Sequence, residues 1–276
     1  MEKNIHRVVI LGGGSAGWLT AGIIAAEHAV GSNSGSSDPS DGFQLILVES
    51  PDISTIGVGE GTWPSMRSTL QKMGISETEF FRECSASFKQ GTLFKNWLGS
   101  DKQGSHDSYI HPFTVPQSYA DTNLAPHWQL IRDQVNFADA VCPQSALAEG
   151  YQAPKKISTP EYAFQLNYGY HLDAGKFAEL LRAHCVDKLG VIHIKANVEG
   201  INSAANGDIA SIVTDRAGTV EGDLFVDCSG SRSLLLGERR LHILIPVALI
   251  AAFSIWYLVQ EVLGIFLRPW PFFLGV

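Results

Sequence analysis

The sequence predicts an α/β fold with a parallel β-sheet, and three features point to it. A short apolar run at 8–11 suits a strand that is buried on both faces. A glycine-rich turn at 12–17 and an alanine-rich helix at 18–28 follow it. A second apolar strand is predicted at 43–48, after a polar loop at 31–42. Strand, helix and strand in this order form a βαβ unit, whose strands lie parallel in one sheet.

The remaining elements are predicted from periodicity and capping signals. The segment 76–79, Ser-Glu-Thr-Glu, matches a capping box, which marks the start of a helix. Phe80, Cys84 and Phe88 recur at intervals of four residues and predict one apolar face of that helix. Residues 100–165 lack a clear periodicity and are predicted to form an inserted, loop-heavy substrate region beside a site. The other predicted elements are a helix at 64–72, a helix from Asp173 to about Lys188, a strand at 191–194, a hairpin of 198–201 and 209–215 that turns at Asn206-Gly207, and a strand at 224–226.

The composition limits the class of protein. The 276 residues are 45% hydrophobic and 17% charged, which favours a folded protein with a substantial core. Lys and Arg number 20 and Asp and Glu number 28, and this net charge of −8 argues against nucleic acid as the main partner. The four cysteines form no CxxC pair and the nine histidines form no HExxH motif, so we expect no metal site. The N-terminus shows no secretory signal, and we expect a cytoplasmic protein.

The glycine-rich turn matches the dinucleotide-binding pattern GxGxxG. Gly12 permits the tight turn, Gly14 lets the backbone approach a pyrophosphate, and Gly17 lets the helix pack close to the strand. Ser15 and Ala16 lie in the same turn, and the N-terminus of the helix directs its partial positive charge at the phosphates. The pattern alone is a weak signal, but the strand before it and the helix after it are the context that the mechanism requires. An ordinary glycine-rich turn is the alternative.

Two acidic residues that follow predicted strands are further candidates for cofactor binding. Glu49 follows Gly17 by 32 residues, and 20 of these remain when the 12-residue polar loop is left out. That spacing suits a carboxylate that accepts a hydrogen bond from a ribose hydroxyl; an exposed glutamate is the alternative. Asp227 opens an Asp-Cys-Ser-Gly turn after the last predicted strand. This second turn favours FAD over NAD; an ordinary turn at a strand end is the alternative.

Five separated segments carry a family resemblance. They are GGGSAGWLTA at 12–21, GVGEGTWP at 57–64, RECSASFKQGTLFKNW at 82–97, YHLD at 170–173 and DCSGSRSLLL at 227–236. In these segments and in their order, the chain resembles the flavin-dependent tryptophan halogenases. The resemblance covers about residues 5–237, and it is specific because several distant motifs occur together.

The resemblance implies an enzyme that uses reduced FAD, supplied by a separate flavin reductase. In that family the reduced flavin reacts with oxygen to give a flavin hydroperoxide, which a chloride or bromide ion attacks to give hypohalous acid. The acid passes through a tunnel to a lysine beside the aromatic substrate. Lys89 matches this lysine, either as an ammonium that orients the hypohalous acid or as an amine that forms a chloramine. The implied reaction is halogenation of tryptophan or another indole.

The resemblance also assigns roles near that lysine. Lys89 is expected to project from the end of an element into a cavity, although periodicity alone favours an exposed lysine. The segment 57–64 resembles a strap that connects the flavin and substrate sites. Within it Glu60 is a candidate neighbour of the flavin ring, with a solvated turn carboxylate as the alternative. Val58 and Val198 are weaker candidates for the wall of the cofactor site, with core packing as the alternative.

The sequence departs from the family pattern after about Gly237. It lacks the family's W-x-W-x-I-P motif and a counterpart of a later glutamate near the substrate. Residues 241–259 contain no Asp, Glu, Lys or Arg and are long enough for a transmembrane helix. We expect residues 239–276 to be an out-of-frame or truncated end, with a membrane anchor or a buried helix as alternatives. The chain then consists of an FAD-binding halogenase-like region at 1–237 and a hydrophobic tail, and weak or absent activity is predicted.

Two other functions are consistent with the sequence. One is a different FAD-dependent monooxygenase or oxidoreductase that shares only the dinucleotide turn. The other is a non-catalytic, membrane-associated flavin-binding fragment, if the tail is a genuine anchor.

Overall fold

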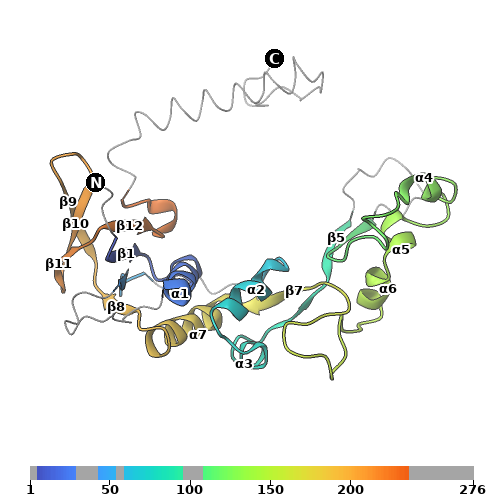
Figure 1. Cartoon of the computed structure of the whole chain (residues 1–276), viewed down its shortest axis with the longest axis horizontal. Coiled ribbons are helices and arrows are strands. Elements are labelled where there is room, and N and C mark those ends of the chain that lie inside the picture. The colour runs from blue at the N-terminus through green and yellow to red at the C-terminus, as the bar shows by residue number, and fades with distance from the viewer. Residues whose placement is uncertain (1–4, 29–42, 54–58, 96–107, 236–276) are drawn as a thin grey trace, which may run out of the picture. The chain divides into compact units, whose positions relative to one another are not determined.

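The computed structural model divides the chain into two units, 1–228 and 229–276. Four segments are described, namely residues 5–28, 43–53, 59–95 and 108–235 (Figure 1). In the second unit the described residues contain a short 3-10 helix, η2, at Gly230–Arg232. All other elements below belong to the first unit.

A four-stranded parallel sheet is the base of the first unit, with the strand order β12-β1-β2-β8. The strands are Arg7–Leu11 (β1), Gln44–Glu49 (β2), Ile192–Lys195 (β8) and Leu224–Asp227 (β12). The apolar residues of β1 and β2 are buried, as a strand covered on both faces requires. Read from β8 to β12, the strands are third, second, first and fourth along the chain, which is the arrangement of half a dinucleotide-binding sheet.

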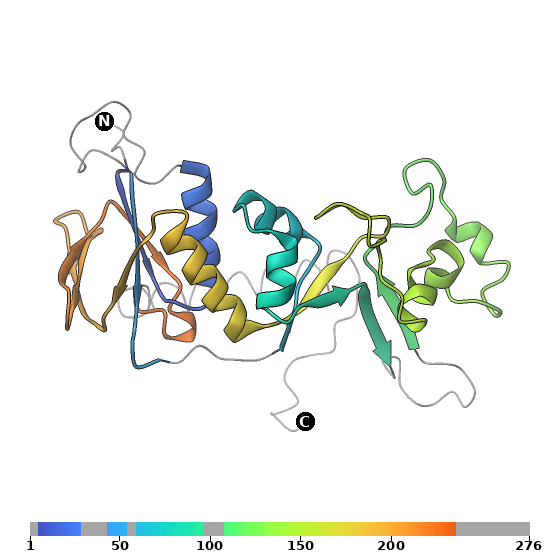
Figure 2. The ribbon, with the colours of Figure 1, turned by 90° about the horizontal axis from the view of Figure 1, so that it is seen from below.

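Helices cover one face of this sheet and a second sheet covers the other (Figure 2). The helices are α1 (Ser15–His28) and α7 (Ala174–Asp187). The other layer is antiparallel and contains β9 (Val198–Ser203), β10 (Ile209–Thr214) and β11 (Gly218–Glu221). The predicted βαβ unit, the helix that Asp173 caps and the hairpin are confirmed; β11 has no counterpart in the sequence prediction.

A three-stranded antiparallel sheet of order β3-β7-β4 lies beside two further helices. Its strands are Gly59–Gly61 (β3), Ser87–Lys89 (β4) and Gly169–Asp173 (β7), and the helices are α2 (Ser65–Lys72) and α3 (Glu77–Glu83). Ser76 caps α3 by accepting a hydrogen bond from the Glu79 N–H at 3.3 Å. Glu161 adds a second cap, because its carboxylate accepts from the Thr78 N–H at 2.9 Å and from the Ser76 hydroxyl at 2.8 Å. These hydrogen bonds from Thr78 and Ser76 lower the pKa of Glu161 to about 2.

The prediction that Phe80, Cys84 and Phe88 share one face of a helix is wrong. α3 ends at Glu83, and Ser85 has φ +48°, a left-handed conformation that does not continue a helix. Phe88 lies on β4, because the chain at this position pairs with β7. Phe80 and Cys84 are fully buried and Phe88 packs against the same core, so the apolar pattern identified core residues but not their secondary structure.

The described part of the region predicted to be loop-heavy, 108–165, contains only short elements. β5 (Gly91–Lys95) pairs with β6 (Ser108–Pro112). Three short helices follow, α4 (Ala125–Trp128), α5 (Phe137–Val141) and α6 (Gln144–Glu149). Long irregular connections separate these elements in 108–165; whether the region is an insertion stays a prediction.

A buried carboxylate stabilises the sheet that carries β4. Glu77 is 4% exposed and accepts hydrogen bonds from the hydroxyls of Tyr168 at 2.6 Å and Tyr170 at 2.7 Å. It also accepts from Lys155 Nζ and the Tyr162 N–H, both at 2.9 Å. Burial opposes ionisation, but the four hydrogen bonds outweigh it, and the pKa of Glu77 lies below its usual range.

The predicted tail helix at 241–259 lies outside the described residues. Within the four described segments, no helix is long and apolar enough to cross a lipid bilayer. Those same segments contain no group of three or more His, Cys, Asp and Glu side chains arranged to hold a metal ion.

We predict that the Glu77 carboxylate makes stability depend on acid pH. Because its pKa is lower in the folded chain than the unfolded value of about 4.3, its contribution is present above that value. The contribution is lost as the pH falls through the lowered folded pKa. Glu77→Gln should lower the free energy of unfolding by about 3 kcal/mol at pH 7, since it removes one partner of a buried ion pair.

Urea unfolding between pH 7 and pH 3 measures this effect. The difference between wild type and Glu77→Gln should shrink toward acid pH. Glu79→Gln, an exposed carboxylate on the same helix, is the matched control and should stay near wild type. A constant difference across the pH range would contradict the prediction.

Candidate functional site

The glycine turn after β1 is held in place by its own backbone. The Gly12 N–H donates to the Val48 carbonyl at 2.9 Å, and Gly12 has φ +121°, which glycine adopts without strain. A Cβ at Gly17 would stand 1.9 Å from the Gly12 carbonyl oxygen, so glycine is required where α1 crosses the turn. A Cβ at Gly14 would meet no protein atom within 4 Å. Protein packing therefore does not require glycine at 14, whereas close approach of a ligand to the backbone would.

The first residues of α1 present their backbone to the same place. Ser15 and Ala16 open the helix, and the N–H groups of a first helical turn have no partner within the helix. These N–H groups and the helix dipole suit an anionic group.

Both acidic candidates lie at the end of the parallel sheet where the carboxyl ends of its strands meet. Glu49 ends β2, and its carboxylate lies against Gly13: a Cβ on Gly13 would stand 2.2 Å from Glu49 Cδ. Asp227 ends β12 in register with Leu11, where the Cys228 N–H donates to the Leu11 carbonyl at 2.8 Å. β2 and β8 lie on one side of β1 and β12 lies on the other, so the strand order reverses at β1, which is the switch point where open α/β sheets bind ligands. The structure thus brings the glycine turn, Glu49 and Asp227 together.

The structure does not bring the remaining cofactor-site candidates to this place. Val58 falls outside the described residues. Val198 begins β9 and pairs with Thr214 in the separate antiparallel sheet. Glu60 is exposed on β3, where it pairs with Leu172.

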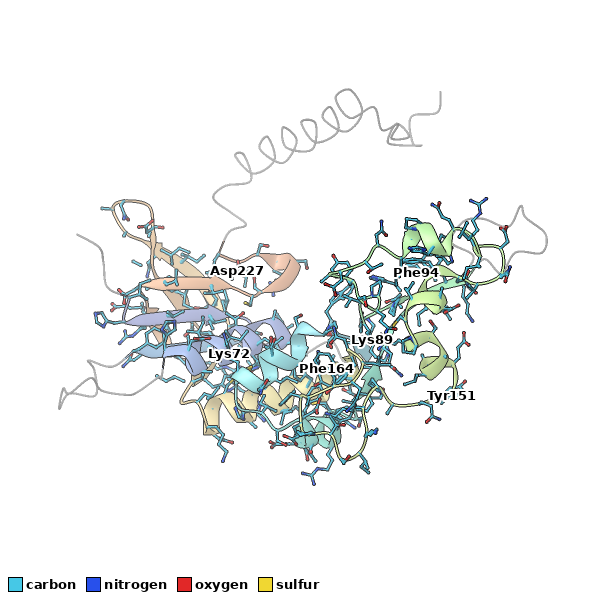
Figure 3. The ribbon with its side chains drawn as sticks, turned by 45° about the vertical axis from the view of Figure 1, so that its right-hand side comes forward. Lys72, Lys89, Phe94, Tyr151, Phe164 and Asp227 are labelled. Atoms are coloured by element: carbon cyan, nitrogen blue, oxygen red, sulfur yellow. The ribbon has the colours of Figure 1, made fainter. Side chains whose placement is uncertain are left out.

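Lys89 ends β4 and faces aromatic rings. Its Nζ lies 5.5 Å from the ring centroid of Phe113 and 5.8 Å from that of Trp63, within the range of cation–π attraction. A Cβ on Gly61 would stand 3.1 Å from this nitrogen, so glycine at this position of β3 leaves room for the ammonium. Figure 3 shows Lys89 and Asp227 on different sheets. Lys89 itself is half-buried.

Strand pairing places Glu60 and Lys89 on opposite faces of the small sheet. Gly61, not Glu60, is the β3 residue against the lysine, and neighbouring residues of a strand point to opposite sides. The residue that shares the face of Lys89 is His171 of β7, which is paired with Gly61. Partial burial and the charge of Lys89 lower the pKa of His171. Sequence reasoning recognised His171 only as part of a motif.

An apolar pocket of about 540 Å³ adjoins the lysine. Trp63 and Phe113, the two rings that face Lys89 Nζ, are part of its wall. The remaining lining residues are Pro64, Tyr109–Pro112, Thr114–Pro116, Asn136–Ala138, Val141 and Cys142. Its size and aromatic lining suit a flat organic molecule. Trp63 and Pro64 belong to the motif at 57–64. The other lining residues were not predicted, because they lie in the irregular region where the sequence has no clear periodicity.

Buried amides hold the Phe113 wall of this pocket. Asn167 Nδ2 donates to the Phe113 carbonyl at 3.0 Å, and the Asn167 N–H donates to Thr114 Oγ1 at 2.8 Å. Gln144 is fully buried, donates to the Asn167 carbonyl at 2.6 Å and accepts from the Thr114 N–H at 2.8 Å. Arg67 donates to the Asn167 side chain and links it to the Tyr168 carbonyl of the segment that leads into β7. The wall is therefore coupled to the sheet that carries Lys89.

Fold and site together define an α/β dinucleotide-binding protein that also has a lysine beside an aromatic pocket. Comparison with known families makes the assignment specific. The family model described as tryptophan halogenase matches residues 7–242. The chain belongs to the tryptophan halogenase family.

Individual relatives agree with this assignment. The chain is 34% identical to tryptophan 6-halogenase ThaL of Streptomyces albogriseolus and 32% identical to tryptophan 7-halogenase RebH of Lentzea aerocolonigenes, with 86% of this chain and 45% of each relative covered. A crystal structure of a tryptophan halogenase from Shewanella frigidimarina matches with a TM-score of 0.79 and 51% identity, covering 86% of this chain and 45% of that one. Xcc4156, a flavin-dependent halogenase from Xanthomonas campestris, matches with a TM-score of 0.69 and 33% identity, covering 85% and 44%. The chain thus spans about half the length of the curated relatives it matches.

The family implies FAD as cofactor, and the glycine turn fits it. The backbone at Gly14 is open to a phosphate, the α1 N-terminus offers N–H donors, and the Glu49 carboxylate lies against the turn.

We predict that alanine has different effects at two glycines of the turn, Gly17 and Gly14. The methyl group of Gly17→Ala would overlap the Gly12 carbonyl oxygen, so the free energy of unfolding should fall by more than about 2 kcal/mol. Gly14→Ala should leave the free energy of unfolding near that of wild type, because its methyl group meets no protein atom. It should weaken FAD binding, because the methyl group would hinder close approach of the ligand to the backbone. Thermal unfolding and FAD titration check both variants. Equal loss of stability in the two variants would contradict this account.

Proposed function

We propose that this chain belongs to an enzyme that halogenates tryptophan or another indole, with Lys89 as the catalytic residue. The observation that carries the proposal is the position of Lys89 Nζ, 5.5 Å from the ring centroid of Phe113 and 5.8 Å from that of Trp63, two neighbouring rings that line an aromatic pocket. The proposed cofactor is reduced FAD from a separate flavin reductase, and the proposed co-substrate is a halide ion. When bound, the flavin supplies the oxidation that turns halide into hypohalous acid.

The residues of the chain form two proposed sites, one that binds the cofactor and one that contains Lys89. Gly12, Gly14 and the first N–H groups of α1 would hold the pyrophosphate, and Glu49 would accept from a ribose hydroxyl. Asp227 lies at the same end of the parallel sheet and would form part of the wall of the cofactor site.

Two chemical roles are open to Lys89. As an ammonium it donates a hydrogen bond to the hypohalous acid and directs the halogen at the bound ring. As an amine it attacks the halogen, which forms an N–halogen bond and releases water. The ring carbon then takes the halogen, the N–halogen bond breaks, and the ring proton that leaves restores the amine. In both roles the aromatic wall would hold the indole through ring contacts.

Mass spectrometry of reaction products tests the proposal. The chain is incubated with L-tryptophan, bromide, oxygen, FAD, a flavin reductase and reduced nicotinamide. We expect a product in which one bromine replaces one ring hydrogen of tryptophan, in low yield, in keeping with the weak activity that the sequence predicts. Lys89→Ala should lose this product by at least 100-fold and keep FAD binding, because the lysine acts away from the glycine turn. Lys95→Ala, an exposed lysine on β5, is the matched control.

The same assay separates this function from that of another FAD-dependent monooxygenase. A monooxygenase would give a hydroxylated product, and its yield would not depend on Lys89. Either result would overturn the proposal.

A further inference from the structure

The two carboxylate oxygens of Glu49 have different surroundings. Oε2 lies 2.8 Å from Nε2 of His193, a residue on the neighbouring strand β8. Oε1 is directed at the glycine turn, since a Cβ on Gly13 would stand 2.6 Å from it. One oxygen is therefore bound within the protein and the other faces the place where the turn presents its backbone.

The direction of the hydrogen bond follows from its chemistry. An ionised carboxylate only accepts, so the imidazole nitrogen next to it must carry the hydrogen and donate. The side chains are shielded, with His193 12% and Glu49 20% exposed. Such a contact restricts rotation of the glutamate more firmly than one in open water would.

The imidazole is itself fixed from two sides. Its strand lies in parallel register with β2, where His193 is paired with Leu47, two residues before Glu49. Its ring packs edge-on against Trp18 of α1, with centroids 5.0 Å apart and planes at 76°. The sheet register and the helix thus both determine where Nε2 can lie.

We propose that His193 is a positioning residue that binds one oxygen of Glu49 and thereby turns the other toward the ribose of the nucleotide. This inference rests on the proposed FAD site. It also gives Gly13, which the GxGxxG pattern leaves open, a role: a side chain there would occupy the place of the carboxylate. A histidine that only supports the fold is the competing explanation.

A double-mutant cycle separates the two explanations. FAD affinity is measured by calorimetry on the full chain for wild type, His193→Phe, Glu49→Gln and the double variant, with urea unfolding of each as the check on folding. We expect His193→Phe to weaken FAD binding about tenfold, and the double variant to bind no more weakly than Glu49→Gln alone. His193→Gln, which keeps an N–H donor, should restore most of the affinity even if the phenylalanine variant folds poorly.

Each other outcome has a clear meaning. If the losses of affinity in the two single variants multiply in the double variant, or if His193→Phe binds FAD like wild type, the positioning role is wrong and the FAD site stands. If the folded wild-type chain binds no FAD at all, the proposed function fails and this inference falls with it.

Discussion

The Glu77 carboxylate is the constraint on which the lysine site depends. Two of its hydrogen-bond donors, Tyr168 and Tyr170, lie on or next to β7 and fill the core side of the small sheet. Because side chains alternate along a strand, the residue between them, Gly169, and the next one, His171, belong to the opposite side. Gly169 is the pairing partner of Lys89. The hydrogen bonds from Tyr168 and Tyr170 to Glu77 therefore determine which face of β7 lies on the side of Lys89.

The chain has two sites that follow different physical rules. The nucleotide site lies at one edge of a parallel sheet, where backbone N–H groups, a helix dipole and Glu49 meet. The lysine site is built from side chains, namely an ammonium, the rings of Trp63 and Phe113, and buried amides behind them. Separation of the two suits a reaction in which one site makes a reagent and the other uses it.

Much of the nucleotide site could be predicted from the sequence. The glycines of the turn, Glu49 and Asp227 follow buried strands, and strand order brings such strand ends together. The pocket could not be predicted, because Phe113 lies in an irregular segment whose position is set by hydrogen bonds from Asn167, far along the chain. Phe88 shows the same limit: its apolar spacing identified a core residue, but pairing with β7 made it a strand. His193 could not be foreseen either, since its role depends on sheet register.

A crystal structure of the chain with L-tryptophan and bromide tests the central claim most directly. The account predicts that the indole ring lies in the pocket against Trp63 and Phe113, with a ring carbon facing Lys89 Nζ. An indole bound elsewhere, with the amino group of Lys89 turned away from it, would contradict the account.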